Sequence, residues 1–363
     1  MLKFKPAVFA VENDYIIAVR VNAPCVMWVE VGGESFYDQS NGILRSATTL
    51  HKMKLPSRIL DARGEYTVCY RKIIERKPYF SQLEDITRVK FSFRAVAGEA
   101  PRAYHLADSH GVVESSVAAA KLYEEKCGKI DFLILNGDVI DHSGDVGNFD
   151  AIYDIAQGIT EGGIPVVFSR GNHDTRGIYA ENIADYTPTR DGFSYFTFRL
   201  GAIWGIVLDC AEDKTDDHEE YGYTICCHDF RMGETKYLED VIRRCAEEYA
   251  APGVEKRIVC CHVPFTKKYE PPFNIEEDTY AYWTKLIGEN IKPDIMICGH
   301  LHTMQVLTEG SEHDAYGQRF TVSVTSLFNY KTRYHAGAGY TFGKDGVKVS
   351  CVDSNGILDE YII

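Results

Sequence analysis

Hydrophobic and polar positions follow two different patterns along the 363 residues of the chain. Up to about residue 98, short apolar runs such as residues 15–21 and 26–31 are separated by turn residues. Residues 87–93 alternate between polar and apolar side chains. Alternation with a period of two is typical of strands, and closely spaced strands of this kind are typical of a β-sandwich. We therefore expect an all-β sandwich domain over residues 1–98.

From residue 99 onward, strand-like apolar segments alternate with segments whose apolar residues recur at helical spacing. The expected strands lie at residues 104–107, 131–135, 165–168, 257–261 and 294–298. The expected helices lie at residues 113–126, 149–160, 234–249 and 279–289, with a polar, acidic insertion at residues 209–229. Alternation of strands and helices indicates an α/β domain over residues 99–363.

Charge and cysteine content narrow the classes of function. The chain has 39 Lys and Arg against 53 Asp and Glu, a net charge of −14, which disfavours bulk binding to nucleic acids or to anionic membranes. Its apolar runs are far shorter than the roughly 20 residues of a membrane span, and the N-terminal segment lacks a normal signal-peptide core. The 11 cysteines, several of them within apolar strands, indicate reduced thiols and a cytoplasmic location. The vicinal pairs 226–227 and 260–261 are an alternative soft-metal site, which the absence of a Cys-x-x-Cys motif disfavours.

Residue types that bind metals follow directly after five of the expected strands. They are Asp108 and His110, Asp138, Asn172 and His173, His262, and His300 and His302. Each motif alone has an ordinary structural interpretation, because Gly-Asp often caps a helix and Gly-Asn-His-Asp can form a turn. Since the carboxyl ends of strands in an α/β sheet meet at one crevice, the five together predict a single site.

The donor set is suited to a pair of metal ions. Carboxylate and amide oxygens combined with imidazoles match Mn, Fe or Zn, and no thiolate is required. A carboxylate such as that of Asp138 can bridge two ions, while the amide oxygen of Asn172 adds a ligand without adding charge. Two such ions about 3.5–4 Å apart can activate a water and bind both oxygens of an in-line displacement at phosphorus.

In this order, the motifs Asp-x-His, Gly-Asp, Gly-Asn-His-Asp, His and Gly-His-Leu-His resemble those of the calcineurin-like metallophosphoesterase superfamily, over about residues 103–352. The resemblance implies a four-layer α/β/β/α sandwich and a phosphoesterase in which a metal-bridging hydroxide attacks phosphorus. It implies that two divalent ions are held by Asp108, His110, Asp138 and His302 and by Asp138, Asn172, His262 and His300. It also implies that His173 is the general acid for the leaving group.

Residues 137–144 are similar to the Gly-Asp-x-x-Asp-Arg-Gly run of the protein serine/threonine phosphatases. By this similarity, Asp141 orients His173, and His142 stands where that family has a phosphate-binding Arg. An imidazole cannot form the guanidinium fork, so the substitution argues against phosphoproteins as substrates. We expect His142 and Arg170 to contact the substrate, and Arg176 is a second cation beside the same motif.

The expected N-terminal sandwich, fibronectin III-like, makes the whole chain similar to purple acid phosphatases and related bacterial phosphoesterases. Those purple enzymes have a metal-bound Tyr where this chain has Asp141, so only their architecture is implied here. We expect hydrolysis of a small phosphomonoester or phosphodiester, with no protein partner identified. The alternative is a catalytically silent scaffold of the same fold, which the complete set of ligand residues disfavours.

Overall fold

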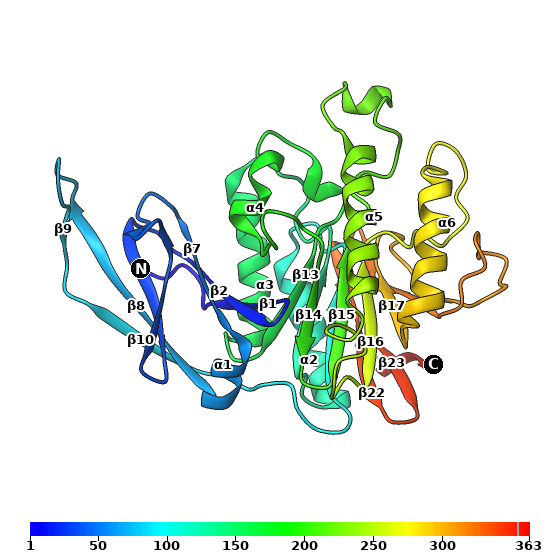
Figure 1. The fold of residues 1–363 in the computed structure, drawn as a ribbon, viewed down its shortest axis with the longest axis horizontal. Helices are drawn as coiled ribbons and strands as arrows, with labels where there is room; N and C mark the ends of the chain where they lie inside the picture. Colours follow the sequence, from blue (N-terminus) through cyan, green and yellow to red (C-terminus); the bar gives the residue numbers. More distant parts are fainter. Residues whose placement is uncertain (354–355) are drawn as a thin grey trace.

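Two mixed β-sheets lie face to face at the centre of the computed structural model, which describes residues 1–353 and 356–363 (Figure 1). The larger sheet has nine strands, in the spatial order β24 (Gly356–Ile362), β23 (Gly346–Asp353), β22 (Ala338–Gly343), β11 (Arg102–Leu106), β12 (Phe132–Asn136), β13 (Pro165–Ser169), β1 (Ala7–Val11), β2 (Asp14–Arg20) and β7 (Leu50–Pro56). The second has six, in the order β14 (Phe196–Leu200), β15 (Ile203–Leu208), β16 (Lys256–Cys261), β17 (Ile295–Cys298), β19 (Val322–Thr325) and β18 (Met304–Leu307).

Parallel pairing at the centre of each sheet determines where polar side chains collect. Strands β11, β12 and β13 are parallel neighbours, and so are β15, β16 and β17. The strands are buried along nearly their whole length, as is typical of parallel strands covered on both faces. Because parallel strands end at the same edge, the segments that follow them lie together at one end of the two sheets.

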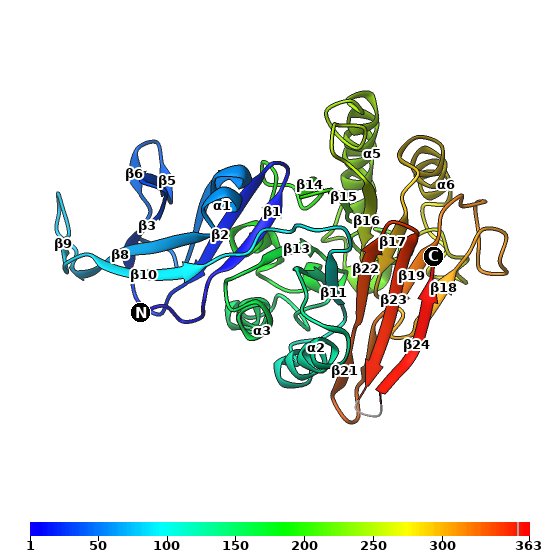
Figure 2. The same cartoon turned by 90° about the horizontal axis from the view of Figure 1, so that it is seen from below.

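Helices cover the outer face of each sheet, which completes the four layers expected of the calcineurin-like fold (Figure 2). The helices are α1 (Ser57–Arg63), α2 (Val113–Cys127), α3 (Asp150–Thr160), α4 (Ile183–Tyr186), α5 (Cys227–Arg243) and α6 (Glu277–Leu286). Helices α2 and α3 pack against the nine-stranded sheet, while α5 and α6 share an apolar core with the six-stranded sheet. Helix α5 starts seven residues before the expected position 234, inside the predicted acidic insertion.

Residues 1–98 are rich in strands, as expected, but these strands belong to two sheets. Strands β1, β2 and β7 extend the nine-stranded sheet, with β1 parallel to β13. A separate five-stranded sheet consists of β10 (Thr87–Ser92), β8 (Glu65–Glu75), β3 (Cys25–Val31) and β4 (Glu34–Tyr37), with β9 (Gln82–Leu83) beside β8. Two short strands, β5 (Gln39–Ser40) and β6 (Ile43–Leu44), form a hairpin.

The predicted boundary at residue 98 therefore does not coincide with a division between sheets. Burial gives the physical reason. All five residues of β1 are buried, whereas β3 alternates between buried and partly exposed positions. A strand that is apolar on both faces is stabilised at the centre of a covered sheet, and an alternating strand is stable with one face toward solvent.

The described chain after residue 320 consists mainly of β-structure. Besides β19 and β22 to β24, it contains a hairpin of β20 (Leu327–Asn329) and β21 (Tyr334–Ala336). In the part of the chain that the structure describes, every helix is too short or too polar to cross a membrane.

Candidate metal centre and active site

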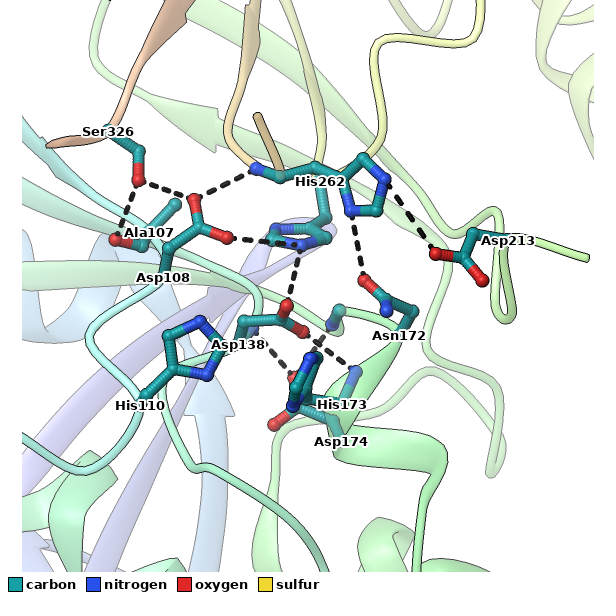
Figure 3. Close-up of polar contacts among 12 residues, drawn as sticks. Ala107, Asp108, His110, Asp138, Asn172, His173, Asp174, Asp213, His262 and Ser326 are labelled. Atoms are coloured by element: carbon teal, nitrogen blue, oxygen red, sulfur yellow. Dashed lines mark hydrogen bonds and ion pairs between the residues drawn. The ribbon is translucent and has the colours of Figure 1, made fainter. Parts of the chain in front are cut away.

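Each predicted metal ligand stands in a loop that begins where a central strand ends. Asp108 and His110 follow β11, Asp138 follows β12, and Asn172 follows β13. From the second sheet, His262 follows β16, and His300 and His302 follow β17. The structure brings all of these side chains together at the edge shared by the two sheets, where Asp108 and Asp138 are both directed toward His262 (Figure 3).

The ligand atoms form two neighbouring groups. In one, atoms of Asp108, His110 and His302 lie within 4.8 Å of one another. In the other, Asp138, His262 and His300 lie equally close. Asp138 connects the groups, because it also belongs to a third cluster with His110 and His173. The family resemblance implies the same two sets with two additions, namely Asp138 as a ligand of the first ion as well and Asn172 as a ligand of the second.

The remaining predicted ligand, Asn172, lies beside the second group. Its Oδ1 is 3.1 Å from Nδ1 of His300, and the Asn172 side chain is buried. The amide oxygen is therefore positioned to share an ion with His300. The arrangement holds every residue type that the expected pair of sites requires.

Buried polar atoms without hydrogen-bond partners are suited to binding a cation. Among the residues that the structure describes, Asp108 Oδ1 and His262 Nε2 are two such atoms, 3.6 Å apart. Burial opposes protonation of His262, but the carboxylates of Asp138 and Asp108 outweigh it and raise its pKa to about 10. Two carboxylates buried against one imidazole make a site in which a positive charge is strongly favoured, and a divalent ion can replace that proton.

The backbone of the site is strained. Five of the predicted ligands adopt positive φ, namely Asp108 at 55°, His110 at 44°, Asp138 at 50°, His300 at 70° and His302 at 50°. This left-handed conformation is unfavourable for residues with a side chain, and it is retained where surrounding structure or function requires it. Close packing adds to the constraint, because a Cβ atom on Gly171 would stand 2.2 Å from Asp138 Oδ1.

Several residues that support the ligands are absent from the sequence prediction. Ser326 donates a hydrogen bond to the carboxylate of Asp108, and the backbone N–H of His300 donates to the same carboxylate at 2.8 Å. His262 donates from Nδ1 to the carbonyl oxygen of Asn136 at 2.7 Å, which directs its Nε2 into the site. Ser326 directly follows β19, so its position at a strand end is a signal in the sequence. The carbonyl of Asn136 has no such signal.

Aromatic rings also border the site. Phe328 and Tyr330, from the hairpin after β19, lie with their ring centroids 5.0 and 5.6 Å from that of His110. Tyr330 is 60% exposed, so its ring is accessible from solvent next to the first group of ligands.

Comparison with protein families agrees with this geometry. The sequence-family model of the calcineurin-like phosphoesterases matches residues 101–304 of this chain, and these residues include all seven predicted ligands. The chain belongs to the calcineurin-like phosphoesterase family. Membership in this family implies a metal-binding phosphoester hydrolase, and the two His and Asp groups are its expected metal centre. No curated protein sequence matches the chain.

Solved structures share the fold at low sequence identity. The purple acid phosphatase PPD1 from yellow lupin (Lupinus luteus) seeds superposes with a TM-score of 0.59 and 13% identity, covering 98% of this chain and 73% of that one. The likeness extends through the β-rich N-terminal part. GAP50, the anchor in the inner membrane complex of Plasmodium, gives a TM-score of 0.46 and 11% identity, with 73% of this chain and 89% of that one covered.

The family's motif histidine, His173, is held by main-chain contacts. Its Nδ1 donates to the carbonyl oxygen of Asp141 at 2.8 Å, and its backbone N–H donates to Asp138 Oδ1 at the same distance. The carboxylate of Asp141, expected to orient His173, instead lies 3.4 Å from Nδ1 of His110. His142 is exposed, and its Nδ1 accepts a hydrogen bond from the backbone N–H of Gly144.

The two arginines beside the Asn-His motif have different surroundings. Arg170 pairs through Nε with the fully buried Asp209 at 2.7 Å, and its guanidinium lies over the ring of Phe230. Arg176 places Nη1 3.3 Å from His173 Nε2, while Glu212 binds its Nε and Nη2, each at 2.9 Å. The cation that reaches His173 is thus Arg176, and Arg170 is engaged by a buried carboxylate.

Proposed function

We propose that the protein hydrolyses a small phosphomonoester or phosphodiester with the help of two divalent transition-metal ions, Mn, Fe or Zn. The proposed ligands are Asp108, His110, Asp138, Asn172, His262, His300 and His302. The observation that carries the proposal is the pair of His and Asp groups that Asp138 connects, each with ligand atoms within 4.8 Å of one another. When bound, the ions would lower the pKa of an attacking water and neutralise charge on the phosphate.

In this proposal, the protein's own residues protonate the leaving oxygen and bind the phosphate. His173 is our proposed general acid, because the carbonyl of Asp141 accepts from its Nδ1 and its Nε2 would deliver a proton to the leaving oxygen once Arg176 Nη1, now 3.3 Å from Nε2, donates to the phosphate instead. Arg176 is our proposed phosphate-binding cation. Glu212 occupies Nε and Nη2, which leaves Nη1 beside His173 to donate to a phosphate oxygen.

The residue at position 142 limits the substrate class that we propose. His142 replaces the Arg that binds phosphate in protein phosphatases, and it is short and exposed. We therefore favour small phosphoesters over phosphoproteins, and the metal residues alone do not separate monoesters from diesters.

Since all 11 cysteines are free thiols, we also propose a cytoplasmic location.

The alternative function is a non-catalytic scaffold of the same fold. A scaffold has no need for buried ligand atoms without hydrogen-bond partners or for strained ligand backbones, which cost free energy. Both features are present around Asp108, so they support the enzyme.

The test is hydrolysis after metal loading. Purified protein reconstituted separately with Mn, Zn and Fe is assayed against aryl monoesters, aryl diesters and natural phosphometabolites, with Asp138→Asn as the control. We expect hydrolysis of at least one class and its loss in Asp138→Asn. A folded protein that binds two ions and hydrolyses none of these esters would support the scaffold instead.

A further inference from the structure

A pocket of about 240 Å³ opens beside His300, on the side of the proposed second ion. Its wall is formed by the segment after β16, the start of α6 and residues 315–316. Five aromatic side chains line it, namely Phe265, Tyr269, Phe273, Tyr280 and Tyr316. His300 itself lines the pocket, and Asp213, which also lines it, lies 4.0 Å from His300 Nε2, so the pocket adjoins the proposed metal centre.

Part of this aromatic lining is open to solvent. Phe273 is 40% exposed, with Nζ of Lys214 5.3 Å from its ring centroid, whereas Phe265 and Tyr280 are buried. Polar groups complete the wall, with Lys267 and Lys268 as cations, Asn274 as an amide and Glu277 as a carboxylate. Aromatic faces combined with a few hydrogen-bonding groups are typical of pockets that bind a planar heteroaromatic ring.

The opposite side of the active site has a different character. The pocket there, of about 430 Å³, is bordered by His110 and His142 and contains the carboxylates of Asp141, Asp150 and Asp154. Apart from the two histidines, its described lining includes no aromatic ring. Arg333 offsets one of these three carboxylates, whereas Lys267 and Lys268 offset two of the three carboxylates in the aromatic pocket, so an anionic substrate is repelled less on the aromatic side.

We propose that the aromatic pocket beside His300 binds the base of a nucleotide substrate, which makes a nucleotide the preferred phosphoester. This inference rests on the proposed phosphoesterase function and names the substrate class for that same site. A volume of about 240 Å³ suits one compact ring system better than a large drug-sized ligand, whose pockets span about 300–1,000 Å³. Stacking on one aromatic side chain is worth about tenfold in affinity.

The first test compares substrates that differ only by the base. Ribose 5-phosphate and the 5′-monophosphates of adenosine, guanosine, cytidine and uridine release the same primary alcohol oxygen, so leaving-group chemistry is matched. We expect kcat/KM for at least one nucleotide to exceed that of ribose 5-phosphate by about tenfold or more. If ribose 5-phosphate is hydrolysed as well as all four nucleotides, the pocket does not bind a base.

The second test changes the pocket. Phe273→Ala should raise KM for the preferred nucleotide about tenfold and leave kcat/KM for ribose 5-phosphate unchanged. Phe80→Ala is the matched control, because Phe80 is also exposed, at 89%, and lies in the N-terminal part. Equal effects of Phe273→Ala on both substrates would overturn the proposal.

A binding measurement separates this inference from the function on which it rests. The four nucleosides, which lack phosphate, are titrated calorimetrically into the wild-type protein and Phe273→Ala, while nitrophenyl phosphate reports hydrolysis. Nucleoside binding that Phe273→Ala weakens supports the pocket even if no ester is hydrolysed. Hydrolysis of nitrophenyl phosphate without nucleoside binding or nucleotide preference supports the function and overturns the pocket.

Discussion

His173 and Asp141 are joined through the main chain of Asp141 rather than through its carboxylate. The imidazole Nδ1 of His173 donates to the carbonyl oxygen at 2.8 Å, and the carboxylate is 58% exposed and lies 3.4 Å from Nδ1 of His110. Asp141 therefore contacts two histidines with two different groups. Its side chain supports a predicted metal ligand, and its backbone orients the proposed acid.

Replacing Asp141 by Asn tests this division. Because the carbonyl oxygen remains, we expect Asp141→Asn to preserve the ratio of rates for alkyl and nitrophenyl phosphoesters. Loss of the charge beside His110 should weaken metal binding about tenfold, as is usual for outer partners of a ligating histidine. Metal titration followed by assays at saturating metal measures both effects. A change in the ester ratio at full metal occupancy would show that the carboxylate acts on His173.

Replacing His173 tests the role of the general acid. An alkoxide leaves poorly without a proton, while a nitrophenolate leaves readily, and a general acid contributes about 10²–10⁴-fold. We expect His173→Ala to reduce hydrolysis of alkyl phosphoesters by about this factor and that of nitrophenyl esters much less. Metal content, measured in parallel, should stay the same. Equal losses for both ester classes would assign His173 to substrate binding or to the nucleophile.

The two arginines of the Asn-His motif offer a matched comparison. Arg176→Gln should mainly lower kcat/KM for phosphoesters, by about 100-fold, because it removes a donor aimed at the phosphate. It also takes the guanidinium from the buried Glu212, but this loss of stability should be the smaller of the two, because Arg176 is partly exposed and Glu212 keeps the hydroxyl groups of Thr175 and Tyr221. Arg170→Gln should instead lower the free energy of unfolding by about 3 kcal/mol, because it leaves the buried Asp209 without its partner. Steady-state kinetics and urea denaturation of both variants give the two readouts. The reverse pattern would restore Arg170 as the substrate-binding residue.

Metal analysis tests the ligand assignment. We expect two ions per chain after reconstitution. His302→Ala should lose mainly the first ion, His300→Ala mainly the second, and Asp138→Asn should weaken both because it removes the charge between the groups. His313→Ala is the control, since that side chain is 40% exposed and belongs to neither group. Equal loss of both ions in the two histidine variants would contradict the division into two sites.

A buried carboxyl group away from the metal residues predicts how stability depends on pH. Glu234 is fully buried and accepts the backbone N–H of Asp209 at 2.8 Å. Burial, and then the charge of Asp209, raise its pKa well above the ordinary value. The folded protein thus holds a proton that the unfolded chain releases above about pH 4.3, so stability falls as pH rises from there.

Glu234→Gln removes this titration and keeps the accepting oxygen. Relative to wild type, the free energy of unfolding of Glu234→Gln should therefore increase between about pH 5 and about pH 9. Urea denaturation of both proteins across this range measures the difference. A difference that is constant with pH would show that Glu234 does not carry the titration.

The local pattern of apolar and polar residues was enough to predict much of the fold and the residues that make up the site. Apolar runs and their ends revealed β11, β12, β13, β16 and β17 and the polar residues that follow each. Since parallel strands end at one edge, the convergence of Asp108, Asp138 and His262 followed without any knowledge of their distances. That these residues bind two ions remains a prediction.

Which groups contact each other was decided only by the tertiary structure. The sequence identifies Asp141, Arg170 and Arg176 as neighbours of the motif. It does not show that the carbonyl oxygen of Asp141 accepts a hydrogen bond from His173, that Asp209 pairs with Arg170, or that β1 pairs with β13. The reason is physical. Burial and strand formation depend on residue types a few positions apart in the chain. A hydrogen bond or a sheet partner depends instead on distances between segments far apart in the chain, and only the packed core determines those distances.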